Sequence, residues 1–165
     1  MAESFTVDIL PTAKSERYAG LLGEIQSVLG GETGRVARMA TISSMLASAF
    51  DTFFWTGFYQ VDSDRPTELV IGPYQGTLGC LRIAFGRGVC GTAAAERRTV
   101  IVPDVDAFPG HIACDSRSRS EIVVPVLDAS GELIAVLDVD SVELAAFDET
   151  DQAGLEAILA WAFGG

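Results

Sequence analysis

Positively charged residues are scarce in this chain. Eleven lysines and arginines stand against twenty-three aspartates and glutamates, which gives a formal net charge of −12 and a pI near 4.3. Nucleic-acid backbones and anionic membrane surfaces are bound mainly through lysine and arginine. The small clusters Arg97-Arg98 and Arg117/Arg119 do not reverse the balance. The composition therefore argues against a nucleic-acid partner and against a membrane partner.

Long apolar runs are also missing. No segment approaches the roughly 20 apolar residues that a membrane-spanning helix needs. The first ten residues, MAESFTVDIL, lack the basic patch and apolar run of a secretory signal. Disorder is not expected either, because 48% of the residues are apolar and the mean hydropathy is +0.31. The 165 residues are about the size of one domain, so we predict a single cytoplasmic domain over residues 1–165.

Cysteine occurs three times, but never in a closely spaced pair. Cys80, Cys90 and Cys114 are an odd number in a chain without an export signal, which does not favour structural disulfides. With His111 they could form a Cys3His zinc site, yet the C-x2-4-C spacing typical of zinc sites is absent. We therefore predict no metal, and the alternatives are buried inert thiols or redox chemistry.

Hydrophobic patterning predicts an α+β fold. Apolar residues at helical spacing predict helices over residues 15–29, 33–50 and 148–163, with Thr33 and Asp148 as N-caps, and a short helix over 90–97. Aromatic and β-branched runs predict strands over residues 53–61, 68–71, 81–85, 99–102, 122–127 and 133–139. Because turns join several of these strands as hairpins, we expect a mostly antiparallel sheet with helices packed on one side.

Two loop regions invite a functional interpretation. Gly86-Arg-Gly-Val-Cys-Gly91 fits the G-x-G-x-x-G dinucleotide pattern, but no acidic residue follows about 20 positions later, so a tight turn is favoured. The predicted loop over residues 104–119 holds His111 and Cys114. Loops longer than about 12–15 residues within a compact domain are usually functional.

The residues around Cys114 suit thiolate chemistry. Arg117 and Arg119 lie close enough in sequence to stabilise a thiolate at Cys114, although Asp115 acts in the opposite direction. Cys80 follows the flexible stretch Gly76-Thr-Leu-Gly79, which could bring a second thiol to the first. A buried, unreactive role remains the alternative for each cysteine.

Carboxylates near apolar strands form a second candidate group. Asp138 and Asp140 flank Val139, so strand alternation directs both side chains to one face, and Glu121 begins another strand. They could simply meet solvent at strand ends. Alternatively, they cluster in a pocket, where like charges raise one pKa and keep a proton available near neutral pH. Trp55 is either a core residue or a pocket wall for a methyl or thioether group.

Motifs along nearly the whole chain resemble the free methionine-(R)-sulfoxide reductase family. They are WTGFY at 55–59, GPYQG at 72–76, FGRGVCGTA at 85–93, PDV at 103–105, FPGHIACD at 108–115, SRSEIVVP at 118–125 and LDVDS at 137–141. The resemblance implies a GAF fold with its core over about residues 15–163, in which an antiparallel sheet and helices enclose one small-molecule pocket. It also implies a homodimer, which is common in the family.

The resemblance further implies residue roles and a reductant. Cys114 matches the family's nucleophile, Cys80 its recycling cysteine and Cys90 a third, auxiliary cysteine. The substrate-holding residues it implies are Trp55, Glu121, Asp138 and Asp140. The implied activity is thioredoxin-dependent reduction of free L-methionine-(R)-sulfoxide, with no bound cofactor and with NADPH supplying electrons through thioredoxin reductase.

A non-enzymatic GAF sensor, which binds a small ligand or reports oxidation through its thiols, is the alternative from another functional class. Sensors are usually joined to an output domain, and this chain shows neither spare length nor a linker. The three motif cysteines also favour catalysis.

Overall fold

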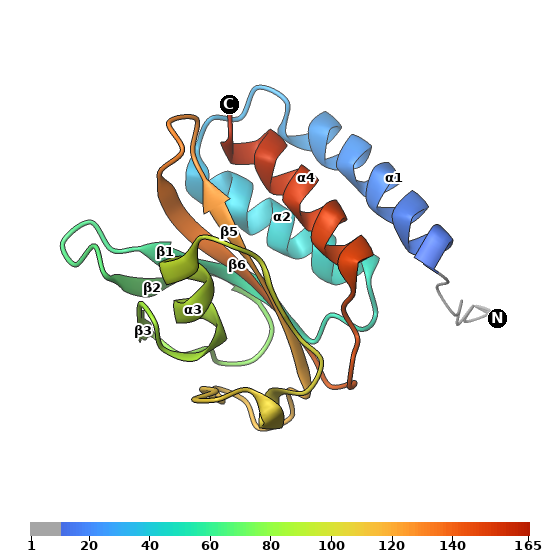
Figure 1. Cartoon of the computed structure of the whole chain (residues 1–165). Helices are drawn as coiled ribbons and strands as arrows, with labels where there is room; N and C mark the ends of the chain where they lie inside the picture. Colours follow the sequence, from blue (N-terminus) through green and yellow to red (C-terminus); the bar gives the residue numbers. More distant parts are fainter. Residues whose placement is uncertain (1–10) are drawn as a thin grey trace.

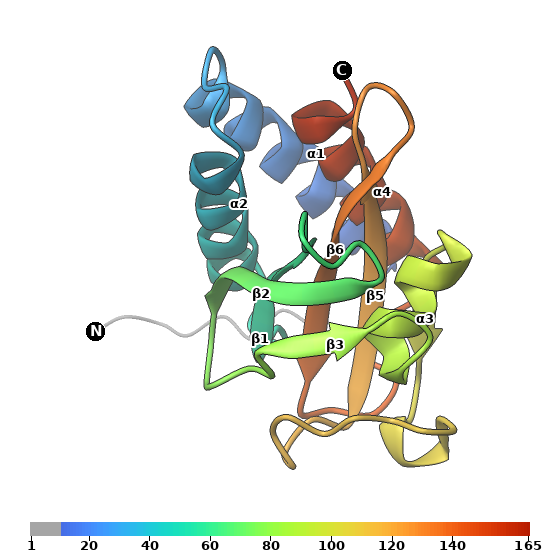
Figure 2. The same cartoon turned by 90° about the vertical axis from the view of Figure 1, so that its left-hand side faces the viewer.

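A six-stranded antiparallel sheet in the order β3-β2-β1-β6-β5-β4 organises the protein. The structure is a computed structural model that describes residues 11–165 (Figures 1 and 2). The predicted α+β class and antiparallel sheet are confirmed. The prediction about a secretory signal concerns residues 1–10, which lie outside the described residues. No described helix is long and apolar enough to cross a membrane.

The elements follow the predicted order along the chain. The helices are α1 (Pro11–Leu29), α2 (Arg35–Ala49), α3 (Gly88–Glu96) and α4 (Glu149–Phe163), with a 3-10 turn at Val105–Ala107. The strands are β1 (Trp55–Val61), β2 (Glu68–Gln75), β3 (Arg82–Ala84), β4 (Val100–Val102), β5 (Ser120–Leu127) and β6 (Leu133–Ser141).

The larger core lies between one face of the sheet and helices α1, α2 and α4 (Figure 1). The apolar faces of α2 and α4 meet the central strands, and α1 packs on these two helices. The fully buried side chains of this core include Ile25, Ile42, Leu46, Phe58, Leu137 and Leu155. Removal of so much apolar surface from water is the main favourable contribution to folding. This core fixes β1, β5 and β6, the strands that carry the candidate acids and Trp55.

Helix α3 covers the opposite face, so the expectation that the helices pack on one side was wrong. Small and β-branched residues of α3, among them Val89 and Ala93, are buried against Val123 and Val136 of the sheet. Because alanine and glycine are small, this short helix lies close to the strands without a thick apolar layer. A second, smaller core and a cavity result on this side.

The predicted ends of several elements needed correction. Asp148 caps α4 as predicted, since its side chain accepts hydrogen bonds from the backbone N–H groups of Thr150 and Asp151. Thr33 does not cap α2, because Gly34 occupies the N-cap in an extended conformation. Strand β2 continues past residue 71 to Gln75, since a register irregularity in its pairing with β1 accommodates the intervening Gly-Pro pair.

Candidate active site

A cavity opens on the α3 side of the sheet. Concave sites with apolar walls and a few convergent polar groups are where proteins usually bind small molecules. The residues around it come from β1, β5, β6, α3 and two loops, and include Trp55, Tyr59, Cys90, His111, Cys114, Ser118, Glu121, Asp138 and Asp140. Six of the seven predicted site residues are among them; Cys80 instead reaches the cavity edge through its bond to Cys114.

Strand register brings the three candidate carboxylates together. Asp140 of β6 pairs with Trp55 of β1 on one side and with Glu121 of β5 on the other. Paired residues in an antiparallel sheet direct their side chains to the same face, and so do residues two apart in one strand. Asp138 therefore joins Asp140 and Glu121, and the predicted common orientation of the two aspartates is confirmed.

Burial raises the pKa of each carboxyl in this cluster well above its ordinary value. Glu121 and Asp138 are each only 5% exposed, so the alternative of solvent-exposed strand ends is wrong for this pair. Repulsion between the carboxylates adds to the shift but is smaller than the effect of burial. Among the described residues, no group hydrogen-bonds to Oδ1 of Asp138. Burial and repulsion both favour the protonated, neutral form of these acids.

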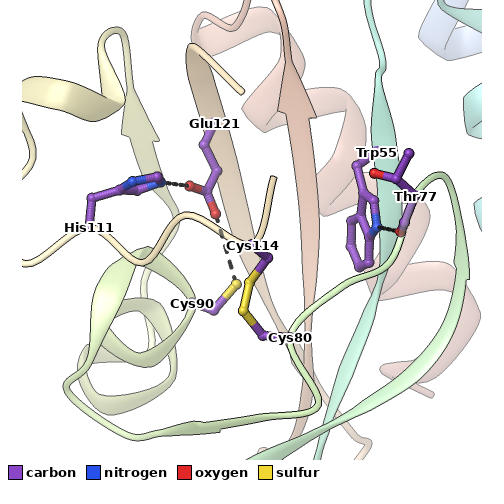
Figure 3. Close-up of a disulfide and its surroundings, with 7 residues drawn as sticks. All are labelled: Trp55, Thr77, Cys80, Cys90, His111, Cys114 and Glu121. Atoms are coloured by element: carbon purple, nitrogen blue, oxygen red, sulfur yellow. Dashed lines mark hydrogen bonds and ion pairs between the residues drawn. A yellow bond between two sulfur atoms is a disulfide. The ribbon is translucent and has the colours of Figure 1, made fainter. Parts of the chain in front are cut away.

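Cys80 and Cys114 form a disulfide at the edge of this cavity (Figure 3). Their Cα atoms lie 5.5 Å apart although the residues are separated by 34 positions. A hydrogen bond of 2.8 Å from the Thr77 hydroxyl to Asp115 also joins the two loops that carry the cysteines. The two thiols that sequence reasoning placed in separate loops thus meet beside the acids.

Arg117 does not serve Cys114 in the way that its sequence position suggested. Its guanidinium pairs with Asp115 at 2.8 Å and lies over the ring of Phe54. Hydrogen bonds from Arg117 and Thr77 lower the pKa of Asp115, so the positive charge is balanced locally. Stabilisation of a Cys114 thiolate by Arg117 is therefore not supported by this arrangement.

Cys90 is a buried free thiol at the start of α3. Its Sγ lies 3.9 Å from Oε1 of Glu121 (Figure 3), and burial together with the nearby acids raises its pKa well above the ordinary thiol value. Donor atoms of Cys90, Glu121 and Asp138 lie within 4.8 Å of one another. This set is one donor short of the four that a structural zinc takes. The Cys3His alternative is not assembled, because Cys80 and Cys114 are bonded to each other.

Trp55 forms an aromatic wall of the cavity. Its indole N–H donates to the Thr77 carbonyl at 2.8 Å, and its rings stack on Tyr74 and Tyr59 with centroids 5.0 and 5.7 Å apart. Gly76 has φ +133°, and a Cβ there would lie 2.7 Å from the indole. Glycine is therefore required at this position both by its backbone conformation and by the close approach of Trp55.

The Gly86–Gly91 segment starts with a tight turn, as favoured from the sequence, and its last four residues begin α3. The N–H of Gly86 donates to the Gly91 carbonyl at 2.8 Å, and that of Arg87 to the Ala84 carbonyl at 3.1 Å. Dinucleotide binding by this motif needs a parallel βαβ unit. Every strand pair in the described part of the chain is antiparallel, so the nucleotide alternative is excluded.

Sequence reasoning missed three cavity residues. Tyr59 follows Trp55 by four positions in the same strand, so alternation alone would have placed both on one face. The side chain of Ser118 hydrogen-bonds with Asp140 and opposes part of the rise in the pKa of that carboxyl. His111 was considered only as a zinc ligand, whereas its Nε2 lies 3.3 Å from Oε2 of Glu121 (Figure 3).

Comparisons with known proteins agree with this geometry. The family model for the GAF domain matches residues 17–162. The chain is 50% identical over 159 residues to the GAF domain-containing protein A of Dictyostelium discoideum, which spans 96% of this chain and 97% of that protein. It is 42% identical over 147 residues to the free methionine-R-sulfoxide reductase of Escherichia coli, spanning 89% and 87%. It is similar to the X-ray structure of the Neisseria meningitidis free methionine-R-sulfoxide reductase in complex with its substrate, with a TM-score of 0.84, 52% identity and coverage of 88% and 86%.

Proposed function

The chain belongs to the GAF domain family and, within it, to the free methionine-R-sulfoxide reductases, which are oxidoreductases. On this premise we propose that it reduces free L-methionine-(R)-sulfoxide to methionine by cysteine chemistry. Cys114 is the nucleophile, Cys80 recycles it, and thioredoxin supplies the electrons. The observation that carries the proposal is the juxtaposition of the Cys80–Cys114 pair with a buried cluster of acids whose pKa values burial raises.

The acid cluster supports the first chemical step. Sulfoxide sulfur is electrophilic, but its oxygen leaves only after protonation. The Cys114 thiolate attacks the sulfur while a carboxylic acid, Glu121 or Asp138, donates a proton to the oxygen. The hydroxyl group then passes from the substrate sulfur to the sulfur of Cys114 while the bond between the two sulfurs breaks. Methionine is released, Cys114 becomes a sulfenic acid, and the donor becomes a carboxylate. The raised pKa values of both acids favour this role, because they keep the proton in place until the substrate arrives.

The second step regenerates the thiols. Cys80 attacks the sulfenic sulfur of Cys114, the S–S bond forms, and the oxygen leaves as water. The paired sulfurs of Cys80 and Cys114 are the product that this step requires. Thioredoxin then reduces the disulfide by thiol–disulfide exchange and is itself reduced with electrons from NADPH. This cycle needs a reducing compartment, and we therefore place the reaction in the cytoplasm.

The cavity walls support recognition of a free amino acid. Trp55 and Tyr59 offer a flat aromatic surface for the methyl group and sulfur of the substrate. An ammonium group beside a buried carboxyl favours its ionised form, so one member of the Asp138/Asp140 pair binds the substrate nitrogen as a carboxylate. We expect the walls of this cavity to exclude flanking peptide, so a sulfoxide-containing pentapeptide should not be turned over.

A thioredoxin-coupled assay of NADPH oxidation tests the proposal. The separated (R) and (S) forms of free methionine sulfoxide serve as substrates, and only the (R) form should be consumed. Cys114→Ser should abolish NADPH oxidation, whereas Cys80→Ser should release about one methionine per chain and then stop. Reduction of the free (R) sulfoxide by Cys114→Ser at the parent rate would refute the assignment of the nucleophile.

The same preparation separates the enzyme from the sensor alternative. A sensor would bind the ligand, or change its thiol state, without catalytic consumption of NADPH. Light scattering on this preparation also measures whether the chain forms the homodimer that the family resemblance implies.

A further inference from the structure

His111, the single histidine of the chain, lies beside the buried acid cluster. Its Nε2 is 3.3 Å from Oε2 of Glu121 (Figure 3), and its side chain is 13% exposed against 6% for that of Glu121. On the other side of the same carboxyl group, Oε1 of Glu121 faces the buried thiol of Cys90 at 3.9 Å. Of the two titratable side chains on either side of this carboxyl group, His111 is therefore more exposed than Cys90.

The pKa values of the two groups are displaced in opposite directions. Burial lowers the pKa of His111, with Asp106 partly opposing the change, and burial raises the pKa of Glu121. Both shifts favour transfer of a proton from the imidazole to the Glu121 carboxylate, relative to the same two groups in water. The titratable and charged groups around the pair from the other packed elements are Cys90 of α3, Asp138 and Asp140 of β6, Asp106 of the 3-10 turn, and Arg87 and Asp115 of the cavity loops.

When Glu121 supplies the proton for the departing oxygen, this acid is left without its own proton. A carboxylate then remains in a cluster where ionisation is unfavourable, next to the carboxyls of β6. The next turnover requires that the proton be replaced from solvent. Glu121 itself is almost completely buried, so a carrier at its side shortens the route.

We propose that His111 is the positioning residue of Glu121 and returns the proton that Glu121 gives to the sulfoxide oxygen. This proposal rests on the proposed function. The protonated ring gives up its Nε2 proton, so that one N–H bond breaks and one O–H bond forms on Oε2. The neutral ring then takes up a proton from solvent. Protons move in this step and no electrons are transferred, and imidazole suits the role because its ordinary pKa lies between pH 5 and 8.

Two variants separate proton transfer from simple support. His111→Ala removes both functions, whereas His111→Gln keeps a side-chain N–H donor that can hold Glu121 but cannot carry a proton. At saturating thioredoxin, we expect both variants to lower kcat about tenfold or more, with KM changed less than about twofold. Added imidazole should restore kcat in His111→Ala, and the parent protein under the same imidazole should not respond.

The outcomes discriminate between the possible roles. Full activity in His111→Gln, or loss in His111→Ala that imidazole does not restore, would overturn proton return and leave only a supporting role. Parent-level kcat in both variants would overturn the proposal entirely. If the parent protein itself does not consume the sulfoxide, the proposed function fails and not merely the role of His111.

Nuclear magnetic resonance provides a readout that does not depend on turnover. Because the chain has one histidine, the imidazole signal can be followed with pH without assignment by mutagenesis. We expect its midpoint to lie below the ordinary histidine value and to move in Glu121→Gln. A midpoint that Glu121→Gln leaves unchanged would show that the two groups are not coupled and would also overturn the proposal.

Discussion

Replacement of Asp138 by asparagine should stabilise the fold while impairing the reaction. Asp138 is 5% exposed, and Oδ1 has no hydrogen-bond partner among the described residues. Burial, followed by the charge of Glu121, raises its pKa well above the ordinary value. Asparagine has nearly the same shape as the protonated acid but cannot ionise. The variant therefore removes the unfavourable charged state and keeps the packing.

The pH dependence of the effect follows from the direction of the shift. Below the ordinary aspartate pKa both the folded and the unfolded chain carry the proton, and the raised pKa costs nothing. As pH rises, the unfolded chain ionises first, and the parent loses about 1.4 kcal/mol of stability per pH unit until the folded pKa is passed. The asparagine variant escapes this loss. Its advantage over the parent should therefore be larger at about pH 8.5 than at about pH 5.5, by up to about 1.4 kcal/mol for each pH unit over which the folded carboxyl stays protonated.

Urea unfolding followed by tryptophan fluorescence measures this advantage. The oxidised protein is compared with the variant at about pH 5.5 and about pH 8.5, above the pI near 4.3. Asp128→Asn is the control, because hydrogen bonds from Ser130 and its neighbours lower the pKa of Asp128. That carboxylate is ionised throughout the window, so its replacement should cause a loss that does not change with pH. An Asp138→Asn variant that is equally destabilised at both pH values would refute the reasoning.

Two further predictions concern packing around the site and the helical layer. Gly57→Ala should destabilise the protein by about 1–3 kcal/mol and raise KM, because a Cβ there would lie 2.2 Å from Cβ of Tyr74. Urea unfolding measures the loss of stability, and steady-state kinetics measure KM. Asp151→Asn should cost about 3 kcal/mol, since the buried carboxylate accepts a hydrogen bond from Lys14 Nζ at 2.7 Å. Activity per folded molecule should not change, and Glu149→Gln, at an exposed position of the same helical turn, should leave the urea midpoint unaltered.

Local patterns in the sequence were enough for the strands and for one helix cap. The alternation around Val139 correctly predicted that Asp138 and Asp140 share a face, because strand geometry leaves no other choice. Asp148 was predictable for the same kind of reason, since its carboxylate satisfies N–H groups two and three residues away. The position of α3 was not predictable from these patterns. The face of the sheet that a short helix covers depends on the path of the loops before and after it.

The site depended on contacts between residues distant in sequence. The pairing of Cys80 with Cys114 was an implication of the family resemblance, whereas spacing alone left metal, redox and inert interpretations open. The pairing of Arg117 with Asp115 shows the limit of arguments from sequence proximity. A guanidinium two residues from a carboxylate pairs with it and not with the sulfur that the sequence places nearby. The proximity of His111 to Glu121 became visible only when its loop was placed against β5.

The division between strands and loops has a consequence for the reaction. Glu121 and Asp138 lie on central strands, where pairing on both sides holds their backbone, so their positions should not depend on the redox state. Cys80 and Cys114 lie on loops, which side-chain contacts and the disulfide join to each other. Reduction removes the covalent link but leaves the acids in place. In the proposed mechanism, the sulfurs separate to admit substrate and meet again to form the disulfide, while the proton donors keep the geometry that protonation of the sulfoxide oxygen requires.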